Sequence, residues 1–117
     1  LIASVKVWVG DSCLAPRVDG GVMVKYVSDR CPEVTGRGGF LIHPYVEGIH
    51  DGTCWNDGTE MVTWPMGDWS KLKDQIDHYL THDDEREKVA AAGRDRTMRD
   101  HVYSVRLAQV LEAVCPS

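Results

Sequence analysis

Hydrophobic and polar positions along the chain predict three short strands in its first two thirds. β-Branched and aromatic residues fill 5–9 before Gly-Asp-Ser, and the apolar run 40–42 is closed by His43-Pro44. Residues 59–64 alternate in polarity until Pro65. Short apolar or alternating runs that stop at glycine, aspartate or proline are typical of strands. We therefore expect strands at 5–9, 40–42 and 59–64.

Helical spacing dominates the rest of the pattern. Ser28 or Asp29 can cap a short helix over 29–36, because Pro32 then falls in the first turn, where its missing donor is harmless. A second helix begins near Trp69, and Asp84-Glu85-Arg86-Glu87 matches a capping box that opens a third helix, expected to end at Gly93. A last helix is expected from His101 to Val114. The second helix has its apolar face at Trp69, Leu72, Ile76, Tyr79 and Leu80.

The order of these elements indicates an α/β fold. Strand, loop, helix, strand, loop, strand and then helices is typical of a parallel sheet that is covered by helices on both faces. With 117 residues, the chain fits one domain spanning 1–117. A complete doubly wound sheet has about five or six strands. We therefore predict a partial Rossmann-like sheet of about three strands with a helical C-terminal third.

Composition narrows the function classes. The formal charge is −5 and the basic residues form no cluster, which argues against a nucleic-acid partner. No apolar stretch approaches the roughly 18 residues of a transmembrane helix. The first ten residues lack the basic leader and cleavage site of a signal peptide and are interpreted as the start of a strand. These features predict a cytoplasmic protein.

The cysteines and histidines give no metal signature. Cys13, Cys31, Cys54 and Cys115 form no Cys-x-x-Cys pair, so small buried hydrophobes in a reducing cytosol are expected. His78 and His82 share a metal-compatible spacing, as do His50 and Cys54, but neither pair has a third ligand at a recognisable spacing. We therefore predict no metal. Trp55, beside Asn-Asp-Gly, is expected at a loop tip.

Candidate binding residues follow the first predicted strand and open the short helix. Ligands of parallel α/β sheets bind beyond the carboxyl ends of the strands, where helix amides favour phosphate. The amides near Ser28 to Arg30 are expected to face that crevice, and Glu33 could accept two hydroxyl hydrogen bonds from a ribose. Arg30 and Arg37 could pair with a diphosphate. Asp11 and Ser12 stand at the end of the first predicted strand. The alternatives are a solvated Glu33, surface ion pairs of the arginines and a simple turn at 11–12.

The run Ser28-Asp29-Arg30-x-x-Glu33-x-x-Gly36-Arg37-Gly38-Gly39-Phe40-Leu41 resembles the C-terminal domain of GT-B nucleotide-sugar glycosyltransferases, in a bacterial and phage, group-1-like branch. The chain is similar to only the second half of that domain. The resemblance implies that Glu33 binds the ribose of a nucleotide-diphosphate sugar and that the amides from Val27 to Arg30 face the pyrophosphate. Lys25 stands where retaining members have the first Glu of a Glu-x7-Glu pair. Further matches are 6–12, Glu47-Gly48, Tyr79-Leu80, Glu85-Arg86, Ala92-Gly93-Arg94, His101-Val102-Tyr103 and Arg106.

The function that this resemblance implies is sugar transfer from a nucleotide sugar, the substrate, to an unknown acceptor, without a cofactor. It assigns no catalytic residue. The alternative from another class is a non-catalytic nucleotide-binding or protein-interaction half-domain. A receiver-like domain fits the fold but lacks the expected acidic cluster and lysine. Because half a sheet leaves an edge and apolar surface uncovered, we also expect self-association or a partner domain.

Overall fold

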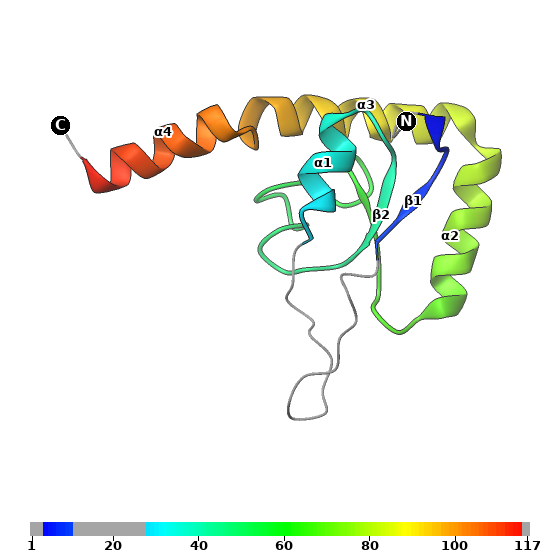
Figure 1. The fold of residues 1–117 in the computed structure, drawn as a ribbon. Coiled ribbons are helices and arrows are strands. Elements are labelled where there is room, and N and C mark those ends of the chain that lie inside the picture. Colours follow the sequence, from blue (N-terminus) through cyan, green and yellow to red (C-terminus); the bar gives the residue numbers. More distant parts are fainter. Residues whose placement is uncertain (1–3, 11–27, 116–117) are drawn as a thin grey trace.

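The computed structural model describes residues 4–10 and 28–115. Three parallel strands form one sheet in the order β1 (Trp8–Val9), β2 (Leu41–Pro44) and β3 (Val62–Trp64) (Figure 1). Trp8 pairs with Leu41, and Ile42 pairs with Val62. The predicted parallel α/β sheet is confirmed.

The strands differ in extent from the sequence prediction. β1 contains only the last two residues of the predicted 5–9. β2 extends to Pro44, beyond which the Tyr45 N–H donates to the Trp64 carbonyl, 3.1 Å away. The prediction for 59–61 is wrong, because the amides of residues 59 and 60 donate to the Asn56 carbonyl and close a turn there.

Helices cover both faces of the sheet, as predicted. Alternate strand residues point to opposite faces, and the two faces form separate apolar clusters. One cluster is covered by α1 (Arg30–Gly36), and the other by α2 (Trp69–Thr81) and the start of α3 (Asp83–Asp100). The α1 side contains Cys31, Val34, Leu41, Trp55 and Met61. The α2 side contains Phe40, Ile42, Val62, Trp64, Leu72 and Val89.

The third helix departs most from the prediction. α3 runs through Gly93 to Asp100, so the expected end at Gly93 is wrong. Gly93 is buried where α3 crosses the 56–60 turn, and a Cβ atom there would overlap the Glu60 carbonyl oxygen. The capping box is also wrong. His82 alone separates α2 from α3, which places Asp84 inside the first turn.

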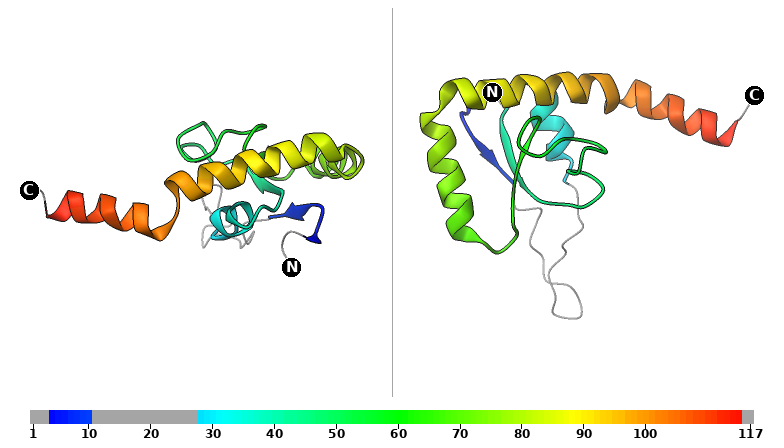
Figure 2. Two further views of the ribbon diagram at one scale, coloured as in Figure 1. Left: turned by 90° about the horizontal axis from the view of Figure 1, so that it is seen from above. Right: turned by 180° about the vertical axis from the view of Figure 1, so that it is seen from behind.

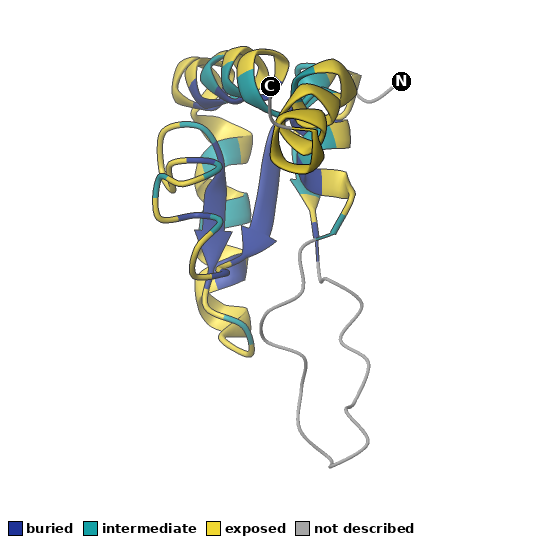
Figure 3. Ribbon diagram, turned by 90° about the vertical axis from the view of Figure 1, so that its left-hand side faces the viewer, coloured by how far each residue is buried: buried dark blue, intermediate teal, exposed yellow. Residues whose placement is uncertain are grey.

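The last helix, α4 (Tyr103–Val114), begins two residues later than expected and continues past the sheet, away from the rest of the chain (Figure 2). None of its residues is buried (Figure 3). Five of its large apolar residues are more than half exposed: Tyr103, Leu107, Val110, Leu111 and Val114. Apolar surface of this extent is typical of an interaction site. The expected self-association or partner domain stays a prediction.

Among the described residues, no helix is both long enough and apolar enough to cross a membrane.

Candidate functional site

A cavity of about 570 Å³ lies between α1 and the corner where α3 meets α4. Its volume falls within the range of roughly 300–1,000 Å³ that is typical of small-molecule sites. Asp29, Glu33 and Arg37 line the α1 side, and Met98, His101 and Tyr103 are among the residues that line the other side. We call this cavity the α1 pocket.

The α1 wall follows from helical geometry. Asp29 precedes α1, Glu33 lies within it and Arg37 follows it. Because these residues are four positions apart, they lie on one side of the helix. All three are exposed. Among the residues that the structure describes, none makes a hydrogen bond or ion pair with the side chain of Glu33 or of Arg37. Both groups are therefore available to a ligand.

Buried hydroxyl groups fix α1 against α3. The Thr35 and Thr97 hydroxyl oxygens lie 2.6 Å apart, and the Trp55 indole N–H donates to the Thr97 hydroxyl at 3.0 Å. Cys31 and Val34, on the same side of α1 as Thr35, are buried in the core. The pocket therefore lies between two helices that a shared polar contact holds at a fixed separation.

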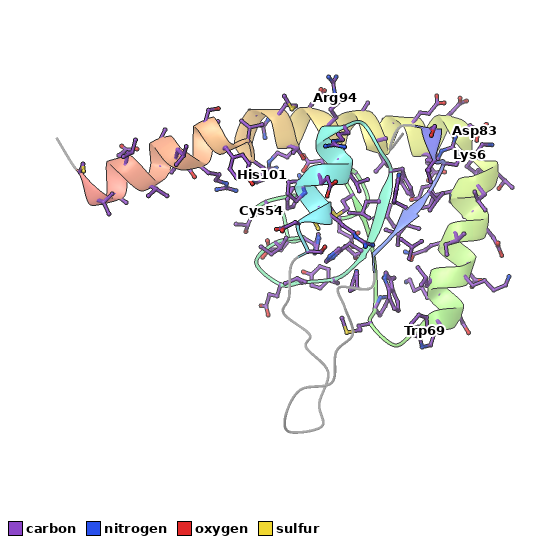
Figure 4. All side chains as sticks on the ribbon, in the orientation of Figure 1. Lys6, Cys54, Trp69, Asp83, Arg94 and His101 are labelled. Carbon is purple, nitrogen blue, oxygen red and sulfur yellow. The ribbon has the colours of Figure 1, made fainter. Side chains whose placement is uncertain are left out.

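The opposite wall is fixed by His101 at the α3–α4 corner. His101 lies beside Cys54 (Figure 4), and its Nε2–H donates to the Cys54 carbonyl at 2.7 Å. Its Nδ1 accepts from the Arg106 guanidinium. The ring packs on Trp55, with centroids 4.3 Å apart. Burial lowers the pKa of His101, and the positive charges of Arg106 and Arg96 lower it further.

The prediction that Trp55 occupies a loop tip is wrong. Trp55 is only 4 % exposed, because its indole bonds to Thr97 and its rings pack on His101. The sequence signal, an Asn-Asp-Gly run directly after Trp55, correctly marks a turn. It does not reveal that the chain folds this turn back onto α3.

The structure brings Ser28, Asp29, Arg30 and Glu33 together around the start of α1. Several amides there already have acceptors. The Arg30 N–H donates to the Ser28 hydroxyl at 3.2 Å, and the Cys31 N–H donates to the Ser28 carbonyl at 3.0 Å. The Glu33 N–H donates to the Asp29 carbonyl at 3.1 Å. A phosphate oxygen would have to displace the Ser28 hydroxyl to use the Arg30 amide.

The other three candidate residues, Val27, Asp11 and Ser12, lie outside the described residues.

A buried Cys-His-His cluster is a grouping that the sequence did not indicate. Cys31, His43 and His50 offer ligand atoms within 4.8 Å of one another, under the carboxyl end of β2. The Val46 N–H donates to His50 Nδ1 at 3.0 Å, so the neutral ring carries its proton on Nε2. A zinc ligand needs a lone pair on that atom. This hydrogen bond therefore opposes metal binding by His50.

Burial also keeps the cluster uncharged. It raises the pKa of the Cys31 thiol to about 12, with a smaller contribution from Cys54. Burial and, to a smaller extent, the neighbouring His43 lower the pKa of His50 to about 4. His50 Nε2 has no hydrogen-bond partner among the described residues, and leaving a buried donor unpaired costs about 1–3 kcal/mol. The cluster is therefore a source of acid sensitivity.

The free energy of unfolding should fall as the pH drops from about 6.5 to about 4. In this window the unfolded chain protonates His50, whereas the folded chain keeps the ring neutral. His50→Asn keeps an acceptor for the Val46 N–H but does not titrate, so its stability should depend less steeply on pH. Urea unfolding of both proteins across this range measures the difference. Equal slopes would show that His50 does not titrate abnormally.

The fold is that of a parallel α/β protein, a class whose ligand sites lie beyond the carboxyl ends of the strands. Cys31 at the start of α1 and His43 near the end of β2 belong to one cluster, so the start of α1 lies at that edge of the sheet. The α1 pocket adjoins the same edge, because α1 forms one of its walls. Residues 16–112 match the model of the glycosyl transferase-like family, and the chain belongs to this family. The resemblance inferred from the Ser28–Leu41 run is thereby confirmed at the level of the family. No curated protein and no solved structure matches the chain.

Proposed function

We propose that the chain provides the donor site of a glycosyltransferase, in which the α1 pocket receives the nucleoside of a nucleotide-diphosphate sugar. The observation that carries this proposal is Glu33, a carboxylate without a partner among the described residues, in a pocket of suitable size. Membership of the glycosyl transferase-like family supports it. The proposal places the protein in the cytoplasm, with a GT-B architecture and no cofactor.

The proposed chemistry divides the ligand along α1. Both Glu33 carboxylate oxygens can accept hydrogen bonds from vicinal ribose hydroxyls. The diphosphate lies outside the pocket by the exposed Arg30 guanidinium, which offers charge-assisted hydrogen bonds, near Ser28 and the backbone amide of Asp29. Sugar transfer expels the nucleoside diphosphate, and a cation beside that leaving group stabilises the charge that develops on it. The site also holds the donor in position for an acceptor.

A second candidate function is nucleotide or protein binding without turnover. The exposed apolar face of α4 favours it, because that face offers a surface for a second protein domain. In this case the α1 pocket would still bind a nucleotide. The two candidates differ in whether sugar is released from the donor.

Calorimetric titration with UDP, GDP and ADP tests the donor site. We expect one of these nucleotides to bind, and Glu33→Gln to weaken binding tenfold or more, a loss of about 1.4 kcal/mol. The substitution keeps the size of the side chain but replaces one acceptor oxygen by a donor. Glu112→Gln, on the exposed surface of α4, is the matched control and should bind as the wild type does.

Two results would contradict the proposal. One is the absence of binding by all three nucleotides, and the other is an affinity that survives Glu33→Gln unchanged.

A further inference from the structure

The end of the α1 pocket beyond Glu33 contains a cation and an aromatic ring that the proposed ribose and diphosphate contacts do not use. Arg37 follows α1 directly, and Tyr103 begins α4 on the other side of the pocket. The Tyr103 side chain is 88 % exposed. Within the described part of the chain, no hydrogen bond or ion pair engages either side chain.

Charge opposes placing the diphosphate inside the α1 pocket. Two carboxylates, Asp29 and Glu33, line the pocket together with the single guanidinium of Arg37. A diphosphate inside the pocket would lie against like charges, which disfavour it. Arg30 is exposed and is not among the residues that line the pocket. The diphosphate therefore fits outside, by Arg30, and an uncharged group fits inside.

The spacing along α1 suits a nucleoside in that direction. A helix rises about 1.5 Å per residue, which places Glu33 about 4.5 Å beyond Arg30 and Arg37 about 6 Å beyond Glu33. Arg30, Glu33 and Arg37 therefore follow one another along α1 in the same order as the diphosphate, ribose and base of a nucleotide. With the diphosphate by Arg30 and the ribose on Glu33, the base extends toward Arg37 and Tyr103.

We propose that Tyr103 and Arg37 form a nucleobase subsite, in which the base stacks on the tyrosine ring and the arginine donates to a carbonyl oxygen of the base. This inference rests on the proposed function. A guanidinium has donors only, so it suits the keto groups of uracil and guanine. The exocyclic amino group of adenine would face it as a second donor. The subsite therefore selects uridine or guanosine diphosphates over adenosine diphosphate.

Titration of variants with UDP, GDP and ADP tests the subsite. Tyr103→Ala should weaken binding of the preferred nucleotide about tenfold, in the range that base stacking gives, whereas Tyr103→Phe keeps the ring and should bind like the wild type. Arg37→Met should weaken binding of the keto nucleotide and reduce its preference over ADP. Arg94→Met, at an exposed arginine of α3, is the matched control. All these positions are exposed, so unchanged thermal unfolding should accompany the changes in affinity.

The outcomes separate this inference from the proposed function. If Glu33→Gln weakens binding but Tyr103→Ala and Arg37→Met do not, the subsite is refuted and the donor site stands. A wild-type preference for ADP would also refute the subsite alone. Absence of binding by all three nucleotides would overturn both.

Discussion

Gly93→Ala should destabilise the fold by about 1–3 kcal/mol, the typical cost of overpacking a well-packed core. The added Cβ would overlap the backbone oxygen of Glu60, which a rotamer change cannot move. That turn is held in place, because its Glu60 carboxylate accepts from Arg96 of α3, and Arg96 also donates to the carbonyls of Gly52 and Thr53. The α3 helix and the turn must therefore separate. Urea unfolding measures the loss.

Helix propensity predicts the opposite sign for this substitution. Alanine in place of a mid-helix glycine gains about 1 kcal/mol when nothing is in contact. Ala91→Gly, two residues earlier on the exposed surface of α3, is the control and should lose roughly that amount. A Gly93→Ala variant more stable than the wild type would show that α3 does not pack closely on the 56–60 turn.

Trp64→Ala should cost about 3–5 kcal/mol of unfolding free energy, as large-to-small core substitutions of aromatic residues do. Trp64 is fully buried in the cluster between the sheet and α2, and its indole N–H donates to the Gly10 carbonyl at 3.3 Å. The substitution removes packing against α2 and the hydrogen bond to Gly10, which follows β1. Thermal and urea unfolding should both detect the change.

The neighbouring Trp69 provides a matched control. Its ring contacts that of Trp64, with centroids 5.1 Å apart, but its side chain is 59 % exposed. Trp69→Ala should therefore cost far less. Similar losses for the two variants would show that the Trp64 site is not the centre of this cluster.

Local patterns were sufficient to predict the elements. The proline in the first turn of α1 and the glycines that follow the helix predicted its position. Helical spacing predicted α2 and α4 within a few residues. Short apolar runs predicted the positions of the strands but overestimated their length. The reason is that pairing partners, rather than the run itself, determine where a parallel strand ends.

The errors occur where distant segments meet. Gly93 has the sequence signal of a helix end, but it lies inside α3. A glycine is needed there because the Glu60 carbonyl oxygen occupies the space of a Cβ atom. Trp55 is buried by contacts with Thr97 and His101, more than forty residues away in the sequence. No local pattern contains such contacts.

The candidate site was predicted in part for the same reason. Glu33, Asp29, Arg30 and Ser28 are neighbours in sequence, and a motif could identify them. The other wall of the α1 pocket comes from Met98, His101 and Tyr103, which only the packing of α3 on α1 brings close. The resemblance did include His101 and Tyr103, but it gave them no place beside Glu33.

The central claim is that a nucleotide occupies the α1 pocket, and amide chemical-shift mapping tests its location directly. Titration of the ¹⁵N-labelled chain with the nucleotide that binds should move the amide resonances of residues 28–37 and 97–103. Among UDP, GDP and ADP, the nucleotide with the highest affinity should give these shifts at the lowest concentration. In Glu33→Gln, the same shifts should need about ten times the nucleotide concentration or more, as the expected loss of affinity requires. Shifts confined to other parts of the chain, or no shifts with any nucleotide, would contradict the account.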